Sequence, residues 1–369
     1  MKPPFRLPTM ADVKDAAGTN GYKMVGTFSG CGGSTTGYKL AGFDIVYAAE
    51  FDNDSVASYR LNYPDANLWT EDIRALTGPR ILEETGLKVG ELDLLEGSPP
   101  CSKFSMSGVR QRTWGKVTES DSEREQANVE DLFFEYLRLV GDLMPRAICA
   151  ENVPGLRMSV AAGYFKQIVE GLEGLGYRVA VYEVNALWCG VPQSRRRLFF
   201  TGIRDDLPVE KIQAPEPLPY KYTMLDALPY LGRAAMVHYD FGVRNIKPPV
   251  TCAKQPMFCL TRTGGGGAHK AHIILCDAGI DDDTHFQPPG VPDPVNRKGK
   301  LTSFDGRVTM ARHPRRFSIP EIKTLASFPP DFYLEGDWAS QWERIGNAVP
   351  PLMAQMVAGR IREALDACR

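Results

Sequence analysis

The feature that most constrains the fold is the alternation of short apolar runs with longer amphipathic stretches between residues 23 and 204. Short apolar runs between turn residues predict strands, and apolar residues at helical spacing predict helices between them. Strands that alternate with helices are typical of a parallel sheet covered by helices. We predict strands at 24–28, 44–50, 92–96, 147–150, 179–184 and 198–203, and helices at 34–40, 54–62, 129–143 and 161–175.

The chain changes character after this region, and its 369 residues exceed the usual size of a single domain. Residues 207–230 are rich in proline and predict a linker. From 233 to 300, glycine, proline and short β-branched runs predict a smaller, irregular, β-rich region, and 345–368 is again helical in pattern. We therefore divide the chain into a first domain (1–206), a linker with a second domain (207–339), and a C-terminal helix that returns to the first domain (340–369).

The composition argues against several classes of protein. No apolar run approaches the ~20 residues of a membrane span, and the first residues lack the apolar core of a signal peptide, so we expect a cytoplasmic protein with no membrane partner. The eight cysteines include no CxxC pair, and we therefore expect neither a metal site nor a disulfide framework. Since the net charge is −2, any contact with nucleic acid must come from local basic clusters. Taken alone, such a cluster is more often a solvated face.

A glycine-rich turn, Phe28-Ser-Gly-Cys-Gly-Gly33, follows the first predicted strand. Glycines there let the backbone approach a ligand, and the free N–H groups of the next helix favour an anionic group. The GxGxxG spacing of a dinucleotide site is absent, because Thr35 stands at the third position. Glu50 can accept hydrogen bonds from ribose hydroxyls, Asp72 can reach an adenine amino group, and the Phe28 ring offers adenine a flat face. Taken alone, the glycine-rich sequence predicts a tight turn without a ligand as readily as a binding site. Together with Glu50 and Asp72, it favours a site for a nucleoside cofactor.

A Pro-Pro-Cys turn follows the strand predicted at 92–96 and ends at Cys101. This is the carboxyl end of the predicted sheet, where open α/β folds bind ligands. Two prolines fix the chain before Cys101, so we expect its thiol to point into a cleft. By contrast, we expect Cys149, Cys189 and Cys276 to be buried apolar residues. All five histidines lie beyond residue 230, which disfavours a Cys–His hydrolase.

Two further polar motifs stand near predicted strand ends. Glu151-Asn-Val153 follows the strand at 147–150, so the Glu151 carboxylate is expected to face the same cleft as Cys101. Taken alone, this motif is more simply a turn or a helix cap. Gln193-Ser-Arg-Arg-Arg197 precedes the last strand and places Arg195 and Arg197 on one face. Arginine supplies fixed donors for a phosphate or a base oxygen, although a surface ion-pair cluster also explains this motif alone.

These motifs, in this order, resemble those of the C5-cytosine DNA methyltransferases of bacterial and phage type. The resemblance covers residues 23–369 except about 230–310. Two positions depart from the family: Leu-Ala-Ser precedes Phe328, and Ile345 precedes Gly346, where the family often has glutamine. Neither departure touches the chemistry. The matching motifs are Phe28-Ser-Gly-x-Gly, Glu50, Asp72, Pro99-Pro-Cys101, Glu151-Asn-Val153, Gln193-x-Arg195-x-Arg197, residues 321–329 and Gly346-Asn-Ala-Val-Pro-Pro351.

The resemblance implies an α/β fold: a Rossmann-like, S-adenosylmethionine-dependent methyltransferase domain with a smaller, irregular, β-rich target-recognition domain. Cytosine C5 is too electron-poor to attack a methyl sulfonium until a thiolate adds to C6, and Cys101 is implied in that role. Glu151 is implied to serve N3 and the exocyclic amine, Arg197 to serve O2, and Arg195 to lie near phosphate or the catalytic loop. The implied cofactor contacts are Phe28, Ser29, Gly30, Gly32, Gly33, Glu50, Phe51, Asp72, Ile73, Pro99, Asn347, Ala348 and Val349.

The same resemblance implies double-stranded DNA as the substrate, with the target cytosine flipped out of the stack. Residues 102–128 correspond to a loop that closes over this base, and residues 231–310 to the target-recognition region. We expect a monomer associated with the nucleoid through DNA, acting as an orphan, restriction-modification or phage-defence methylase, with or without a cognate restriction or defence protein. The implied DNA contacts are Ser102, Arg110, Arg112, Gln193, Arg262, Gly264 and Gly265.

Three other functions compete with this interpretation. A branch of the family methylates tRNA, but its Cys-Phe-Thr signature does not occur in this sequence, and the longer recognition region favours DNA. A non-catalytic DNA-binding relative is disfavoured by the intact Cys101, Glu151 and Arg197. An NAD oxidoreductase is disfavoured by the broken GxGxxG.

Overall fold

The computed structural model describes residues 2–100, 132–158, 161–231, 234–240, 250–260, 271–277 and 315–369. The chain forms two compact units, which we call the sheet unit and the second unit. The sheet unit comprises Asp12–Val184, Arg196–Glu216 and Ala354–Arg369, and the second unit comprises Met1–Ala11, Asn185–Arg195 and Pro217–Met353. These limits differ from the predicted boundaries at 206 and 339, because the first residues and the segment just before Arg196 pack with the second unit.

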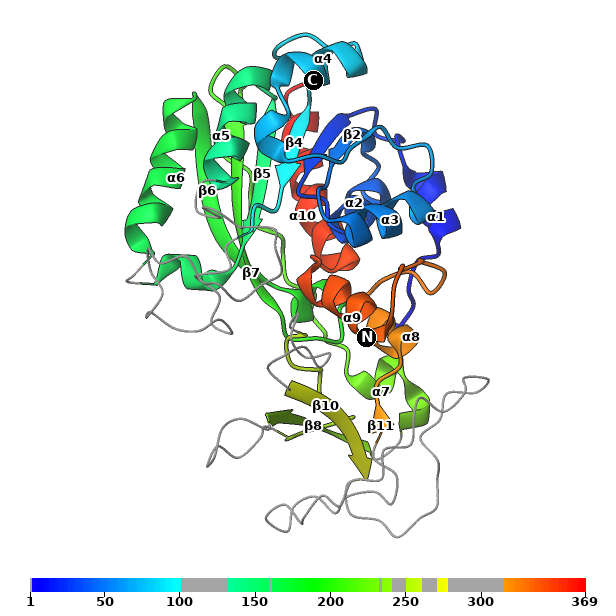
Figure 1. Ribbon diagram of the computed structural model, residues 1–369. Coiled ribbons are helices and arrows are strands. Elements are labelled where there is room, and N and C mark those ends of the chain that lie inside the picture. Colours follow the sequence, from blue (N-terminus) through cyan, green and yellow to red (C-terminus); the bar gives the residue numbers. More distant parts are fainter. Residues whose placement is uncertain are drawn as a thin grey trace. The chain divides into compact units, whose positions relative to one another are not determined.

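A seven-stranded sheet of order β3-β2-β1-β4-β5-β7-β6 forms the centre of the sheet unit (Figure 1). The pairs from β3 to β5 are parallel, but β7 runs antiparallel to β5, so the prediction of a parallel sheet is wrong for this strand. Only residues 186–195 connect β6 to β7, and a parallel crossover needs a longer connection. The strands are β1 (Lys23–Thr27), β2 (Asp44–Ala49), β3 (Leu68–Trp69), β4 (Leu94–Gly97), β5 (Ala147–Asn152), β6 (Tyr177–Asn185) and β7 (Arg196–Arg204).

Helices cover both faces of this sheet. On one face, Phe133 of α5 and Ile168 of α6 belong to the same apolar core as Ile148 of β5, and Figure 1 shows these two helices side by side. The opposite face carries α2, whose Tyr38 hydroxyl contacts the Cys149 thiol of β5. The helices are α1 (Met10–Ala16), α2 (Gly33–Leu40), α3 (Asn53–Asn62), α4 (Gly78–Thr85), α5 (Leu132–Leu143), α6 (Ala162–Gly174) and α10 (Pro351–Asp366), with short 3-10 helices η1 (Ile73–Ala75) and η4 (Pro154–Arg157).

Capping residues explain where several of these helices begin and end. Asp52 precedes α3 and accepts a hydrogen bond from the Ser55 N–H at 2.9 Å. Thr77 caps the start of α4 in the same way, and Gly86, with φ 69, ends that helix in the left-handed region that favours glycine. These contacts satisfy backbone groups that a helix end leaves without partners.

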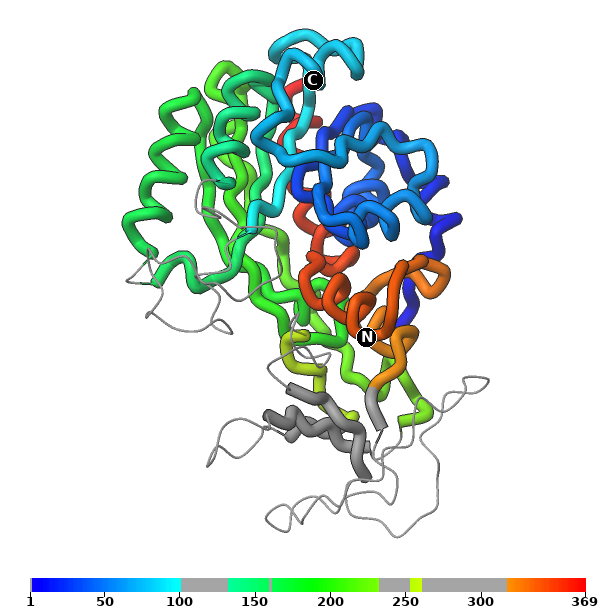
Figure 2. Tube along the Cα trace, viewed as in Figure 1, coloured from blue at the N-terminus to red at the C-terminus, as the bar shows by residue number. Residues whose placement is uncertain are grey.

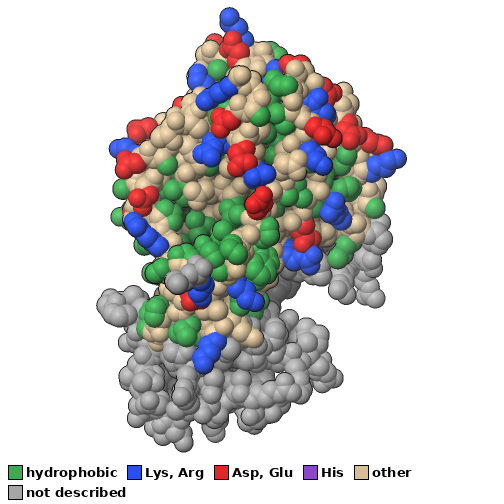
Figure 3. Space-filling view, turned by 180° about the vertical axis from the view of Figure 1, so that it is seen from behind, with side chains coloured by type: hydrophobic (Ala, Val, Ile, Leu, Met, Phe, Trp, Pro, Cys, Tyr) green, Lys and Arg blue, Asp and Glu red, His purple; other side chains and the backbone are tan. Residues whose placement is uncertain are grey.

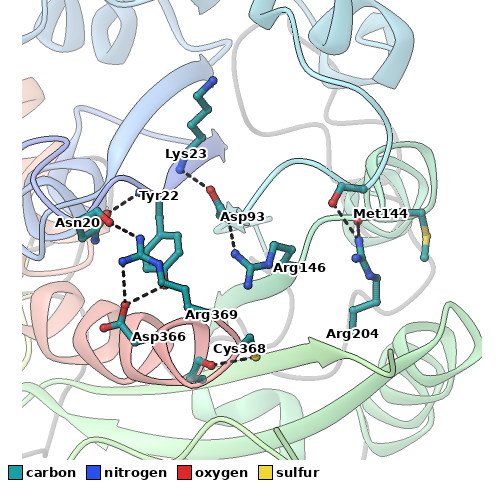
Figure 4. Close-up of polar contacts among 12 residues, drawn as sticks. Asn20, Tyr22, Lys23, Asp93, Met144, Arg146, Arg204, Asp366, Cys368 and Arg369 are labelled. Carbon is teal, nitrogen blue, oxygen red and sulfur yellow. Dashed lines mark hydrogen bonds and ion pairs between the residues drawn. The ribbon is translucent and has the colours of Figure 1, made fainter. Parts of the chain in front are cut away.

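Hydrogen bonds and a cation–π contact join the end of α10 to the residues that precede β1 (Figure 4). Asp366 accepts a hydrogen bond from the Tyr22 hydroxyl at 2.8 Å. The Arg369 guanidinium lies over the Tyr22 ring and donates to the Asn20 carbonyl at 2.7 Å. Figure 2 shows the red C-terminal helix running among the blue and green parts of the sheet unit. In the sheet unit, the last residues of the chain therefore contact residues that precede the first strand.

The second unit contains a four-stranded antiparallel sheet of order β11-β10-β8-β9. Three of its strands fall in the region predicted to be β-rich. Helices α7 and α8 begin with capping boxes, formed by Thr223 with Asp226 and by Ser318 with Glu321. The elements are β8 (Ala234–Asp240), β9 (Val250–Cys252), β10 (Ala271–Asp277), β11 (Arg315–Arg316), α7 (Met224–Ala227), α8 (Ile319–Leu325), α9 (Trp338–Asn347), η5 (Ala186–Cys189) and η6 (Pro229–Leu231).

The charged side chains on the face shown in Figure 3 are mixed, with Lys and Arg interspersed among Asp and Glu. This mixture agrees with the net charge of −2. Of the helices in the described part of the chain, none combines the length and apolar character that spanning a membrane requires.

Candidate active site

The predicted site residues of the sheet unit follow parallel strands that end at one edge of the sheet. Phe28 follows β1, Glu50 follows β2, Pro99 lies just beyond β4, and Glu151 is the second-last residue of β5. The strands pair in register, with the last residue of β1 opposite the last residues of β2 and β4. The motifs therefore meet at the carboxyl edge, where α/β sheets bind ligands.

The cofactor turn, residues 28–33, has an unusual backbone. Phe28 adopts φ 53, a left-handed conformation that is uncommon for residues other than glycine, and Gly32 adopts φ 99. A Cβ on Gly32 would lie 2.8 Å from the Tyr63 ring, so only glycine fits there. Helix α2 starts without a side-chain cap, and the buried Ser29 hydroxyl has no hydrogen-bond partner among the described residues. The turn is therefore suited to receive polar groups of a ligand.

Glu50 organises the cofactor turn. One of its carboxylate oxygens accepts a hydrogen bond from the Gly30 N–H at 2.6 Å. The other accepts from the N–H groups of Phe51 and Asp52 at 2.9 and 2.8 Å. Burial raises the pKa of Glu50, and these backbone hydrogen bonds oppose the shift. Carboxylate oxygens accept more than one hydrogen bond, so the predicted contact with a ribose remains compatible with this arrangement.

The other predicted cofactor residues of the sheet unit differ in exposure. Phe51 is 51% exposed, whereas Phe28 packs partly against the core, so Phe51 offers the more accessible ring for stacking. Asp72 caps η1, and its carboxylate accepts hydrogen bonds from the backbone N–H and the guanidinium of Arg74. Its contact with adenine stays a prediction. Ile73 and Pro99 are buried, as are Ser29, Gly32 and Gly33 of the cofactor turn.

Asn152 connects the Glu-Asn-Val motif to the Pro-Cys turn. Its buried side-chain amide donates to the Pro99 carbonyl at 3.2 Å, and its side-chain oxygen accepts from the Val153 N–H at 2.8 Å. The chain is therefore held two residues before Cys101, which itself lies outside the described residues. The Glu-Asn-Val motif includes Asn152, but the sequence does not predict that its side chain bonds to the Pro99 carbonyl.

Glu151 and Arg197 form an ion pair at this edge. Arg197 Nε lies 2.7 Å from Glu151 Oε1, and the two side chains are only 13% and 12% exposed. They meet because β5 and β7 are adjacent, with Glu151 opposite Phe199 and therefore on the face that Arg197 shares. The pair places a carboxyl group and a guanidinium within reach of one small ligand, in surroundings that strengthen electrostatic interactions.

Arg195 lies inside the second unit. It is 1% exposed, and its guanidinium donates to the carbonyl oxygens of Leu260 and Gly346, both at 2.8 Å, and of Asn347 at 3.1 Å. The expected contact of Arg195 with phosphate or the catalytic loop stays a prediction. The Arg195 donors hold together segments that are distant in the sequence.

Gln193 is also buried, 1% exposed, although it was predicted to contact DNA. Its side-chain amide donates to the Leu325 carbonyl at 3.4 Å, and its side-chain oxygen accepts from the Leu260 N–H at 3.1 Å. The amide is engaged with the backbone of the second unit, and the contact of Gln193 with DNA stays a prediction. The motif thus contributes one residue, Arg197, to the sheet unit and two to the interior of the second unit.

The remaining predicted residues fall into two groups. Three predicted cofactor residues belong to the second unit: Asn347, Ala348 and Val349. Ala348 caps the end of α9, and Val349 is buried. The other group lies outside the described residues: Cys101, Ser102, Arg110, Arg112, Arg262, Gly264 and Gly265.

A buried carboxyl group that the sequence reasoning missed, Glu96, lies in β4 close to the site. Burial, and then the negative charge of Glu151, raise its pKa to about 8, while hydroxyls of Ser34 and Ser98 lower it. A glutamate among apolar residues of a predicted strand is the signal that could have found it. Burial also raises the pKa of the Cys149 thiol, and both Cys149 and Cys189 are buried as predicted.

Glu151 and Arg197 can bind and activate a polar ring. The cofactor turn forms a second site, suited to a ligand with hydroxyl and other polar groups. Arg197 can donate hydrogen bonds to such a ring and the Glu151 carboxylate can accept them, and the cofactor turn can hold the second ligand. No cluster of His, Cys, Asp or Glu suited to a metal ion occurs within the described ranges.

Comparison with known proteins supports a specific family. Residues 22–363 match the model of the C-5 cytosine-specific DNA methylases. The type II methyltransferase M.DdeI of Desulfomicrobium norvegicum is 29% identical over 92% of this chain and 88% of its own length. M.NgoPII of Neisseria gonorrhoeae, also a type II methyltransferase, is 28% identical over 94% of this chain and 97% of its own.

The fold is also similar to that of solved methyltransferases. The structure of a DNMT2 mutant from Spodoptera frugiperda superimposes with a TM-score of 0.59, at 17% identity, over 94% of this chain and 99% of that one. At this identity the similarity concerns the fold alone. It confirms the prediction of a Rossmann-like methyltransferase fold.

Proposed function

The chain belongs to the C-5 cytosine-specific DNA methylases, and on this basis we propose that it transfers the methyl group of S-adenosylmethionine to C5 of a cytosine in double-stranded DNA. One structural observation carries the proposal. The Glu151–Arg197 ion pair lies at the carboxyl edge of the sheet, next to Asn152, which holds the turn that leads to Cys101.

The residues around the cofactor turn fit S-adenosylmethionine. The Ser29 hydroxyl and the uncapped start of α2 suit its polar methionine end, the Glu50 carboxylate suits its ribose, and the exposed Phe51 suits its adenine ring. When bound, S-adenosylmethionine supplies an electrophilic methyl group on a sulfonium. The task of these residues is to bind that cofactor and to orient its methyl group.

Cys101 supplies the nucleophile in this proposal. Its thiolate adds to C6 of cytosine, which breaks the C5–C6 double bond and leaves an electron pair available at C5. This pair would attack the methyl carbon of the bound cofactor, and the bond from that carbon to the sulfonium would break with its electrons passing to the cofactor sulfur, which leaves as a thioether. A base, such as a water molecule, removes the proton from C5. The C5–C6 double bond forms again as the bond between the Cys101 sulfur and C6 breaks, which returns the Cys101 thiolate.

Glu151 and Arg197 stabilise the negative charge that this addition places on the ring. Glu151, which takes up a proton from solvent when its pair with Arg197 loosens, shares this proton with N3 and recovers it when Cys101 leaves, and Arg197 donates a hydrogen bond to O2. In the protein alone these two groups bind each other. We therefore expect the entry of a flipped cytosine to loosen their ion pair, because the base offers both groups new partners.

For DNA recognition we propose the residues that the family resemblance indicates. Ser102, Arg110 and Arg112 would contact the flipped nucleotide or its phosphates, and residues 231–310, with Arg262, Gly264 and Gly265, would read the sequence. Because its relatives are type II methyltransferases, we propose a role in restriction-modification with a cognate restriction enzyme, in preference to an orphan or phage-defence role.

Incubation with methyl-labelled S-adenosylmethionine and either duplex DNA or tRNA tests the proposal. We expect label in duplex DNA at C5 of cytosine, none in tRNA, and none with Cys101→Ser, because serine lacks a nucleophile of sufficiently low pKa. Label confined to tRNA would overturn the proposed substrate. Label in neither nucleic acid, from enzyme that binds the cofactor, would overturn the proposed activity.

A further inference from the structure

Helix α3 packs beside α2 and presents two buried tyrosines to the cofactor turn (Figure 1). Tyr59 lies in the last turn of α3, and Tyr63 is the C-cap of that helix. Their rings lie 5.0 Å apart, and the Tyr59 hydroxyl contacts the Thr35 hydroxyl of α2 at 3.3 Å. A Cβ built on Gly32 would lie 2.8 Å from the Tyr63 ring and 3.3 Å from the Tyr59 ring. Both rings therefore lie against the backbone of the cofactor turn, although no sequence motif marks either tyrosine as a site residue.

A chain of two hydrogen bonds joins Tyr63 to the backbone of the cofactor turn. The Thr36 hydroxyl donates to the Gly32 carbonyl at 2.7 Å. The Tyr63 hydroxyl lies 2.6 Å from the Thr36 hydroxyl oxygen. A hydroxyl has one proton, and that of Thr36 is engaged with Gly32, so Tyr63 is the donor in this second contact. Burial raises the pKa of Tyr63, and its hydroxyl therefore keeps the proton that this contact needs.

The Gly32 carbonyl lies at the junction between the cofactor turn and α2. It also accepts a hydrogen bond from the Thr36 backbone N–H at 2.9 Å, and the Gly32 N–H donates to the Ser29 carbonyl at 3.1 Å. Gly32 adopts φ 99, and α2 starts without a side-chain cap. The direction of the Gly32 carbonyl therefore determines where Ser29 and the first N–H groups of α2 present their polar atoms to a ligand.

We propose that Tyr63 is a positioning residue of the cofactor site: its hydroxyl, acting through Thr36, fixes the Gly32 carbonyl and holds the turn in the conformation that receives the methionine end of S-adenosylmethionine. This inference rests on the proposed methyl transfer. Without the hydroxyl, the turn adopts other conformations at Gly32, which the backbone of a glycine permits. The cofactor then binds only the molecules whose turn is in the receptive conformation, and its apparent affinity falls in proportion to their fraction.

Calorimetry with S-adenosylmethionine measures this effect directly. Tyr63→Phe keeps the ring against the turn and removes the hydroxyl, whereas Thr36→Val keeps the side-chain shape and removes the middle of the hydrogen-bonded chain. Each variant should raise the Kd by about tenfold, which is the size of effect that one lost buried hydrogen bond produces. The double variant should bind about as weakly as either single variant, because both substitutions break the same chain.

The matched control is Tyr177→Phe. Tyr177 is also buried, and its hydroxyl donates to the Pro145 carbonyl at 2.7 Å. Pro145 precedes β5, at the edge of the sheet opposite the cofactor turn. Tyr177→Phe should lower the urea midpoint as Tyr63→Phe does, but it should keep the wild-type Kd. An equal loss of affinity in Tyr177→Phe, or a wild-type Kd in either Tyr63→Phe or Thr36→Val, overturns the role of Tyr63.

Steady-state kinetics separates positioning of the cofactor from a general loss of structure. Because bound S-adenosylmethionine restores the turn, Tyr63→Phe should raise the KM for this cofactor by about tenfold. Its kcat on duplex DNA at saturating cofactor should stay within about twofold of the wild type. A lower kcat at an unchanged KM overturns the proposal. A wild type that binds the cofactor but methylates no DNA overturns the proposed function instead, and calorimetry then still tests the role of Tyr63.

Hydrogen exchange gives a measurement that needs neither cofactor nor DNA. The backbone N–H groups of Gly32 and Thr36 are hydrogen-bonded to the carbonyls of Ser29 and Gly32. In the free protein, both groups should exchange about tenfold faster in Tyr63→Phe than in the wild type, because the turn leaves its conformation more often. Tyr177→Phe should leave their exchange unchanged. Wild-type exchange at both N–H groups in Tyr63→Phe contradicts the proposal, whether or not the protein methylates DNA.

Discussion

Replacement of Arg195 by methionine separates a structural role of this arginine from a direct role at the substrate. Methionine keeps much of the side-chain volume and removes the guanidinium. The three backbone carbonyls of Leu260, Gly346 and Asn347 then lose their donors in a region where water cannot replace them. The matched control is Arg196→Met, because Arg196 is exposed and pairs with Glu183 on the surface.

The expected magnitude follows from the charge and the burial of these contacts. A hydrogen bond to a charged group contributes about 1.5–3 kcal/mol, and contributions from one side chain are not additive. Leaving three buried carbonyls without partners should cost about 3–5 kcal/mol in the free energy of unfolding, as for a broken buried network. Loss of the exposed pair in Arg196→Met should cost about 1 kcal/mol or less.

Urea unfolding followed by tryptophan fluorescence reports on this part of the protein, since Trp188, Trp338 and Trp342 all lie in the second unit with Arg195. With an m-value of about 2–3 kcal/mol/M, Arg195→Met should lower the midpoint by about 1–2 M. An Arg195→Met protein with the wild-type midpoint and a large loss of kcat would refute the structural role, and would restore a contact with substrate as the explanation.

Three further results are expected. Glu50→Ala should weaken binding of S-adenosylmethionine by ~1–3 kcal/mol in calorimetry, because a carboxylate that contacts the ribose and holds the turn is lost; unchanged affinity in a folded variant would refute this. Gly97→Ala should lower the urea midpoint, since its Cβ would lie 2.4 Å from Thr27 Oγ1, whereas Gly359→Ala, with no atom within 4 Å, should not. Exchange of residues 231–310 for those of a relative should change the methylated sequence; an active chimera that keeps the original site places recognition elsewhere.

The positions of the strands could be predicted from the sequence, but their directions could not. The apolar runs that end at Thr27 and Ala49 are bounded by turn residues, so the predicted and observed strands differ there by one residue. The apolar periodicity of a strand does not indicate the direction in which the strand runs in the sheet. The antiparallel direction of β7 follows from the short connection of residues 186–195 between β6 and β7. The boundaries between the units depend on long-range packing, which a change in composition marks only approximately.

The types of the site residues could be predicted, but not all of their partners. Glu50 and Glu151 were recognised from their places at strand ends, and both lie at the carboxyl edge. Arg195 and Arg197 looked equivalent in the sequence, although one is bonded to backbone carbonyls and the other to Glu151. A motif does not distinguish a guanidinium that binds a ligand from one that binds the chain, because both uses need the same donors.

Covalent trapping tests the central claim most directly, that Cys101 adds to the cytosine ring. The adduct is resolved only by loss of a proton from C5, and fluorine at C5 cannot leave in this way. With S-adenosylmethionine and duplex DNA that contains 5-fluorocytosine at the target, the wild type should therefore form a shifted band on a denaturing gel, and Cys101→Ser should form none. A wild type that methylates ordinary DNA but forms no such band, or a band that persists in Cys101→Ser, would contradict the account.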